Sequence, residues 1–195
     1  MIRSPALEED LSWVQLTLNG DKEAFRHIVV KYHGMIYDLC KRMLGQAEEA
    51  EDITQETFLR AFRKLSTYQL SYKFSTWLYT VSLNVIRNHR RRRWLKRMLS
   101  LDVEHEGNAI IEPVDTRYDP EESIKSQRAN ALIDSMLNSL KADWKEPFFL
   151  HYIKNLSCKE VAQILGISEE SVKVRLFRSR SFLERKFRSQ LNDIL

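Results

Sequence analysis

Cysteine and long apolar runs are scarce in this sequence. Its 195 residues include two cysteines, Cys40 and Cys158, and neither stands in a CxxC or CxxH spacing. Zinc sites and disulfide frameworks need such spacings or several cysteine pairs, so we expect reduced thiols in a cytoplasmic protein. No segment approaches the ~20 apolar residues that a membrane-spanning helix needs, and the first ten residues lack an apolar signal core. The sequence therefore predicts no membrane insertion.

Motifs of catalysis and metal binding are missing as well. The histidines, at positions 27, 33, 89, 105 and 151, form no HExxH or other metal-binding spacing, and no glycine-rich loop that would hold a phosphate is present. The absence disfavours an enzyme, such as a nuclease or a phosphotransferase, that would use Glu51, Asp52 or Glu56 with a metal. We expect a protein that is not an enzyme and that uses no metal and no cofactor.

Composition and periodicity predict an all-α protein with two helical domains joined by a flexible linker. A hydrophobic content of 43% permits two helical cores, while 30% charged residues and a net charge of +4 suit a protein that meets polyanions. The helical periodicity fades between about residues 101 and 124, where Gly107, Pro113 and Pro120 interrupt the chain. The expected boundaries are residues 1–97 for the first domain, 98–125 for the linker and 126–195 for the second domain.

Three helices are expected in the first domain. Apolar residues at three- and four-residue spacing predict a helix over residues 22–43, which Asp21 caps and Gly45 ends. A second helix is expected over residues 47–65, with Phe62 on its inward face. A third helix follows a cap at Ser75 or Thr76. Its expected inward side chains are Leu78, Val81, Ser82, Val85, Ile86 and His89.

The second domain has the pattern of a helix-turn-helix. After helices over residues 124–140 and 145–152, Ser157 and Glu160 form the S-x-x-E capping box of a short helix. Gly166 lies in the turn, and Ser168 can cap the next helix. That helix keeps an apolar inner stripe while it carries basic side chains at Lys173, Arg175, Arg178 and Arg180. The pattern indicates a DNA-binding unit, and a capped helical hairpin without DNA is the alternative.

The first domain carries charge of both signs. Its third helix runs into four arginines at positions 90–93, and the face opposite the apolar stripe favours contact with DNA over a merely solvated charge run. That face contains Trp77, Thr80, Asn84, Arg87, Asn88 and Arg91. The aromatic residues at 68, 72, 74 and 77 either stack on unpaired bases or belong to the core. Acidic residues near Asp52 form either a solvated helix start or a docking surface for a basic protein.

Three segments together resemble one known family. Residues 50–62 (AEDITQETFLRAF), residues 74–79 (FSTWLY) and the helix-turn-helix over residues 156–180 are similar, in this order, to extracytoplasmic-function sigma factors, group 4 of the sigma-70 type. The resemblance identifies residues 1–97 with sigma region 2 and residues 126–195 with sigma region 4. It implies a sigma factor that binds core RNA polymerase and directs promoter-specific initiation, in the cytoplasm and at the nucleoid when polymerase-bound.

The resemblance also implies roles for particular residues. Asp52, Gln55 and Glu56 match the segment that binds a coiled coil of the polymerase β′ subunit, and the β flap is a further polymerase contact. Recognition and melting of the −10 element are implied for Lys73, Phe74, Ser75, Trp77, Asn84, Arg87, Asn88 and Arg91. Recognition of the −35 element is implied for Lys173, Arg175, Phe177, Arg178 and Arg180. Besides promoter DNA, an anti-sigma factor is an expected partner.

The sequence departs from the family pattern at a few positions. Glu170 and Ser171 replace a Gly-Thr pair, Val174 stands where a small polar residue is frequent, and Asn88 stands where an aspartate is common. These departures bear on the promoter sequence and not on the fold. The alternative function is a stand-alone helix-turn-helix regulator that binds duplex DNA, which leaves the acidic face around Asp52 without a role.

Overall fold

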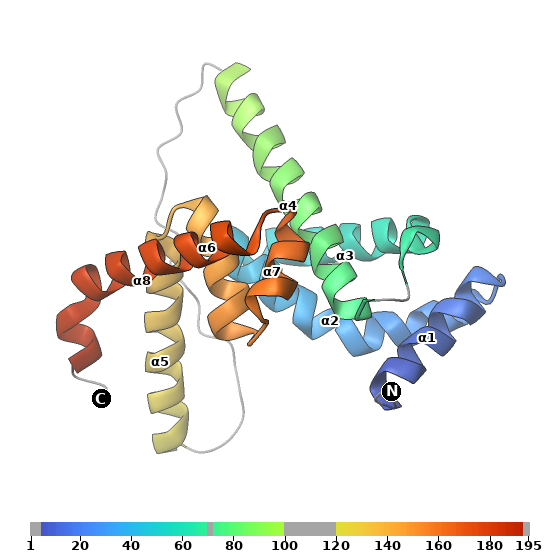
Figure 1. Ribbon diagram of the computed structural model, residues 1–195, viewed down its shortest axis with the longest axis horizontal. Helices are drawn as coiled ribbons and strands as arrows, with labels where there is room; N and C mark the ends of the chain where they lie inside the picture. The colour runs from blue at the N-terminus through green and yellow to red at the C-terminus, as the bar shows by residue number, and fades with distance from the viewer. Residues whose placement is uncertain (1–4, 70–71, 100–119, 193–195) are drawn as a thin grey trace. The chain divides into compact units, whose positions relative to one another are not determined.

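The computed structural model describes residues 5–69, 72–99 and 120–192, which are helical apart from short turns (Figure 1). The chain divides into two compact units, residues 1–109 and 110–195. No strand occurs in the described ranges, so the all-α prediction is confirmed. Of the predicted linker, residues 98–125, the part from 100 to 119 lies outside the described residues. Its two ends, residues 98–99 and 120–125, are helical.

The described residues of the first unit form α1 (Pro5–Leu18), α2 (Lys22–Leu44), α3 (Ala47–Arg63), the short 3-10 helix η1 (Leu65–Thr67) and α4 (Phe74–Leu99). α2 packs against α1, α3 and α4, and α3 also packs against α4. The predicted ends of α2 are confirmed. The Asp21 carboxylate accepts hydrogen bonds from the backbone N–H groups of Glu23 and Ala24. Gly45 ends the helix with a left-handed φ of 89°, which glycine adopts at little cost.

The core of the first unit forms where α2, α3 and α4 meet. Its fully buried side chains include Ile28, Ile36 and Leu39 of α2 and Leu78, Leu83 and Ile86 of α4. α4 begins at Phe74, so neither Ser75 nor Thr76 is its cap, and Phe74 and Thr76 are buried in its first turn. Phe62 was expected to face inward, but it is 39% exposed and meets the ring of Phe25 edge-on.

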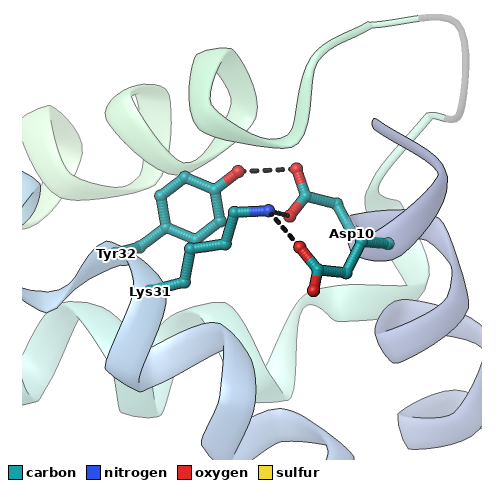
Figure 2. A network of polar contacts seen from close by, with 4 residues as sticks. Asp10, Lys31 and Tyr32 are labelled. Carbon is teal, nitrogen blue, oxygen red and sulfur yellow. Dashed lines mark hydrogen bonds and ion pairs between the residues drawn. The ribbon is translucent and has the colours of Figure 1, made fainter. Parts of the chain in front are cut away.

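The sequence pattern did not predict α1, which a polar network around the buried Asp10 holds against α2 (Figure 2). The Asp10 carboxylate accepts hydrogen bonds from the Tyr32 hydroxyl at 2.6 Å and from Lys31 Nζ at 2.7 Å. Asp10 is 5% exposed, so protein donors take the place of water around its charge. Burial, together with the bond to Asp10, raises the pKa of Tyr32 far above its ordinary value. The tyrosine therefore remains a hydrogen-bond donor at neutral pH.

The described residues of the second unit form α5 (Pro120–Ser139), α6 (Ala142–Phe148), the π-helical turn η2 (Phe149–Ile153), α7 (Cys158–Leu165) and α8 (Glu169–Asn192). α6 and α7 pack against α8. The capping box is present, because Ser157 Oγ accepts from the Glu160 N–H while the Glu160 carboxylate accepts from the Ser157 N–H. Gly166 takes a left-handed φ of 67° in the turn, and Ser168 Oγ accepts from the Ser171 N–H. The predicted helix-turn-helix is confirmed.

One helix was expected over residues 145–152, but the chain forms α6 and then the wider turn η2. Pro147 lies inside α6 and has no amide hydrogen to donate to the Asp143 carbonyl, four residues earlier. The Arg175 guanidinium of α8 makes a long hydrogen bond of 3.5 Å to this carbonyl. α6 is thereby linked to α8 at the point where its own hydrogen-bond ladder is interrupted.

Candidate nucleic-acid and protein-binding surfaces

The exposed face of α4 brings together side chains that the sequence predicted to contact DNA. Four of them are exposed within two turns of the helix, while the opposite face is buried: Asn84, Arg87, Asn88 and Arg91. Lys73 is exposed just before the helix begins, and Ser75 is half-buried in its first turn. Amide and guanidinium groups on one helical face supply donors for phosphate oxygens and for base edges.

The aromatic residues before this face divide between the core and the surface. The ring of Phe74 is fully buried and meets Tyr68 edge-on at a centroid distance of 5.2 Å. Trp77 is half-buried over both rings, and Tyr72 is 44% exposed. In this structure the Phe74 ring is therefore covered, and the exposed aromatic surface next to α4 comes from Trp77 and Tyr72. The sequence alone did not separate the buried rings from the exposed ones, because protein cores and base-stacking surfaces both favour aromatic residues.

The arginine run is divided between a contact within the unit and the surface. Arg93 Nη1 lies 2.7 Å from Glu49 Oε1 of α3, and His89 Nε2 lies 3.2 Å from the same oxygen. His89, expected in the core, is thus half-buried and part of a polar cluster between two helices. Arg90 and Arg92 are exposed. The last turns of α4 extend beyond α2 and α3 (Figure 1). Three basic positions of the run, 90–92, face solvent and can meet phosphates.

The exposed face of α3 is acidic and apolar at once. Asp52 and Gln55 are exposed, and Leu59, one turn beyond Gln55, is 59% exposed. Glu56 is half-buried and forms an ion pair with Arg60, so its charge is partly neutralised within the helix. Protein interfaces combine apolar and polar area, and this face offers both. Leu59 was not among the expected site residues, although its four-residue spacing from Gln55 places it on the same face.

The second helix of the helix-turn-helix presents a basic face with an apolar centre. Its buried stripe is as predicted: Val172, Leu176, Ser179 and Leu183. Lys173, Arg178 and Arg180 are exposed, and Phe177 is 62% exposed. Arg175 is half-buried and bonded to Asp143, so it lies at the edge of this face. Val174, at 46% exposure, lies between the basic residues and was not among the expected site residues.

Nothing in the described ranges has the geometry of a metal centre, since no group of three or more His, Cys, Asp or Glu side chains converges there. Cys40 is buried and Cys158 is half-buried, and neither is in a disulfide. Burial raises the pKa of the Cys40 thiol, which keeps it protonated at neutral pH. Across the described helices, none is long and apolar enough to cross a membrane.

A helix-turn-helix with a basic face, an arginine-bearing helix and an acidic exposed face on α3 are together typical of a protein that binds DNA and another protein. Comparison with known families gives the class. Residues 28–96 match the family described as Sigma-70 region 2, and residues 130–183 match Sigma-70, region 4. The chain belongs to the extracytoplasmic-function sigma factors of the sigma-70 family. It is a sigma factor, which binds core RNA polymerase and promoter DNA and directs promoter-specific initiation.

Individual relatives agree with this assignment and disfavour the stand-alone regulator. The chain is 36% identical over 183 residues to the ECF RNA polymerase sigma factor SigW of Bacillus subtilis, covering 90% of this chain and 92% of the relative. It is 28% identical over 191 residues to the RNA polymerase sigma-H factor of Pseudomonas aeruginosa, with coverages of 95% and 97%.

Two solved structures share the fold. RpoE, in a complex with the anti-sigma factor NepR from Bartonella quintana, has a TM-score of 0.66 at 22% identity, with 83% of this chain and 94% of that chain covered. CnrH, in a complex with the cytosolic domain of CnrY, has a TM-score of 0.64 at 23% identity, with coverages of 93% and 98%.

Proposed function

We propose that this sigma factor contacts core polymerase through the exposed face of α3 and promoter DNA through α4 and α8. The observation that carries the proposal is that α3 exposes Asp52, Gln55 and Leu59 in the same unit in which α4 exposes asparagine and arginine side chains. DNA would repel the acidic face, so two faces of opposite character in one unit call for two different partners.

The α3 face suits a basic protein surface. Asp52 and Gln55 can accept charge-assisted hydrogen bonds, and Leu59 supplies apolar area that becomes buried on docking. Glu56, already paired with Arg60, would act mainly by holding that arginine in place. The family resemblance makes the coiled coil of the β′ subunit the partner of this face, and the β flap the partner of the second unit.

The α4 face suits the −10 element. Asn84 and Asn88 offer amides to base edges, while Arg87 and Arg91 contact phosphates. Lys73, Ser75 and Trp77 would border a base that has left the stack, with Trp77 stacking on it. Phe74 would support this site from the core beneath Trp77 instead of contacting DNA. Strand separation would then come from binding energy alone, without a catalytic residue, metal or cofactor.

The exposed face of α8 suits the −35 element in the major groove. Lys173, Phe177 and Arg178 lie in the first half of the helix, where side chains of a recognition helix reach base edges. Arg180 lies nearer the edge of the face and would contact a phosphate. Arg175, bonded to Asp143, would brace α8 against α6.

We further propose an anti-sigma factor as a second protein partner, in keeping with the family. The anti-sigma factor would hold the chain inactive until it is released to polymerase. The site of action would be the cytoplasm, at the nucleoid when the chain is bound to polymerase.

Transcription from a promoter library tests the proposed function. Purified core polymerase transcribes the library with and without this chain, and the transcript 5′ ends are sequenced. We expect start sites that depend on the chain and share two spaced upstream elements. Chain-dependent start sites without any shared element, or specific duplex binding without transcription, would contradict the proposal.

Two variants separate the proposed surfaces. Asp52→Lys should weaken binding to core polymerase at least tenfold, which is about 1.4 kcal/mol, and leave binding of the chain to the isolated −35 duplex unchanged. The matched control is Glu23→Lys, an equal charge reversal at an exposed acid in the first turn of α2. Asn84→Ala should impair selection of the −10 element more than that of the −35 element. Equal loss at both elements would indicate a folding defect and remove Asn84 from the site.

A further inference from the structure

An apolar pair lies at the centre of the exposed face of α8. Val174 is 46% exposed and Phe177 is 62% exposed, and their three-residue spacing places the Cβ atoms roughly 5–6 Å apart on one side of the helix. The buried residues Val172, Leu176 and Ser179 lie on the opposite side. Neither Val174 nor Phe177 therefore contributes to the core of its unit.

Charged side chains surround this pair. Glu170, Lys173 and Arg178 are all exposed on the same face, one turn or less from Val174. Two of these three charges are positive, and Arg180 adds a third positive charge at the edge of the face. Positive side chains around the pair attract a polyanion. A partner that covers Val174 and Phe177 must therefore carry apolar groups with negative charges around them.

The major groove of DNA provides that combination at one kind of base. Thymine carries a C5-methyl group in the major groove beside its O4 acceptor, and none of the other three bases carries a methyl group there. Valine has no atom that donates or accepts a hydrogen bond, so it cannot read donors or acceptors on base edges. The free energy of binding becomes more favourable when valine covers a methyl group. It becomes less favourable when valine covers an amino group or a carbonyl that would otherwise be hydrated.

We propose that Val174 and Phe177 read thymine methyl groups in the upstream promoter element, and that Val174 is a determinant of promoter choice. The inference rests on the proposed placement of α8 in the major groove. Consecutive bases rise by about 3.4 Å along the DNA axis. Side chains roughly 5–6 Å apart therefore reach one or two neighbouring base pairs. The upstream element should hold thymine, on either strand, at that point.

Deoxyuridine isolates the methyl group, because it pairs like thymine and differs only by the missing C5-methyl. The holoenzyme, made from core polymerase and the full chain, first selects its promoter from a duplex library with two randomised blocks. Each thymine of the selected upstream block is then replaced singly by deoxyuridine, and binding is measured by competition. We expect one or two replacements to weaken binding about fourfold each, as loss of one buried methylene-sized group does. Replacements of thymine in the spacer between the blocks serve as the control.

The variant Val174→Ser links the methyl effect to the side chain. With this variant, the sensitive deoxyuridine replacement should no longer change binding, and selection from the library should tolerate another base at that pair. Val30→Ser is the matched control, since Val30 is an exposed valine on α2 and should leave the methyl effect intact. The deoxyuridine series on the unaltered chain needs no variant, so it holds even where Val174→Ser folds poorly.

The outcomes separate this inference from the proposed function. A selected promoter whose upstream block lacks thymine, or is insensitive to every deoxyuridine replacement, overturns the inference and leaves the sigma-factor assignment standing. An equal methyl effect in the unaltered chain and in Val174→Ser overturns the role of Val174. Failure to select any upstream block overturns the placement of α8 in the groove, and the inference with it.

Discussion

The buried carboxylate of Asp10 should be worth several times more to stability than the exposed carboxylate of Glu9, although both bond the same lysine. Lys31 Nζ lies 2.7 Å from Asp10 and 3.0 Å from Glu9. The Asp10 side chain is 7% exposed, whereas the Glu9 side chain is 53% exposed. Asp10 also accepts the hydrogen bond of the buried Tyr32 hydroxyl. Replacing each acid in turn therefore tests how burial changes the contribution of a carboxylate to stability.

The magnitudes follow from the contacts. Asp10→Ala removes a charge-assisted bond to Tyr32, about 1.5–3 kcal/mol, and leaves that hydroxyl buried without its acceptor. The bond to Lys31 adds little, because the lysine side chain is 28% exposed and water replaces the partner. We expect a loss of about 2–4 kcal/mol in the free energy of unfolding. Glu9→Ala should cost less than about 1 kcal/mol, as exposed ion pairs do.

Urea unfolding followed by circular dichroism measures these losses, and hydrogen exchange of the α1 amides shows where they act. Asp10→Ala should speed exchange throughout α1, since the Asp10 bonds hold α1 on α2. In the double variant with Tyr32→Phe, the loss should be smaller than the sum of the two single losses, because both variants remove the same bond. Equal losses for Asp10→Ala and Glu9→Ala, or additive losses in the double variant, would refute the reasoning.

Three further predictions concern the buried tyrosines, Glu49 and Arg178. Burial raises the pKa values of Tyr32 and Tyr79 in the folded state, so the stability that the neutral phenols contribute is complete below about pH 10 and falls as the pH rises above it. Tyr32→Phe should reduce that alkaline slope by about 1.4 kcal/mol per pH unit in urea titrations, and an unchanged slope would contradict the assignment. Glu49→Gln should lower the free energy of unfolding by about 1 kcal/mol or less, since the Arg93 side chain is 42% exposed, and should speed amide exchange around Arg93, because it weakens the ion pair between α3 and α4; unaltered exchange would show that the pair does not hold α4. Arg178→Ala should cost about 1–3 kcal/mol at one base pair if the guanidinium reads a base, or reduce the salt slope by about one if it contacts a phosphate; binding titrations that show neither change would place Arg178 outside the interface.

Helical periodicity predicts which side chains of a helix are buried and which are exposed, and to that extent the candidate surfaces were predictable from the sequence. The buried stripes of α4 and α8 leave Asn84 and Arg178 exposed, as the spacing indicated. Helical periodicity left open where the side chains of Phe74 and Arg175 lie. The first is buried under Trp77, and the second bonds a carbonyl of α6 that Pro147 leaves without its helical donor.

The sequence by itself determined the ends of α2, the helix-turn-helix and the family. Caps such as Asp21 and the Ser157–Glu160 box act within three or four residues, and so does Gly45, whose lack of a Cβ permits a left-handed backbone; no distant contact is needed to predict them. The motifs of the two sigma regions are local in the same way, so the order of residues along the chain is enough to identify the family.

Only the tertiary structure decided which charged side chains remain available to a partner. Asp10 meets Tyr32 across 22 residues, and Glu49 meets Arg93 across 44 residues. Charge and polarity are visible in the sequence, but the partner of a charged group depends on which helices pack together and at which turn. A long-range ion pair leaves no periodic signal, so an arginine that binds phosphate and an arginine that binds the neighbouring helix look alike until the chain is folded.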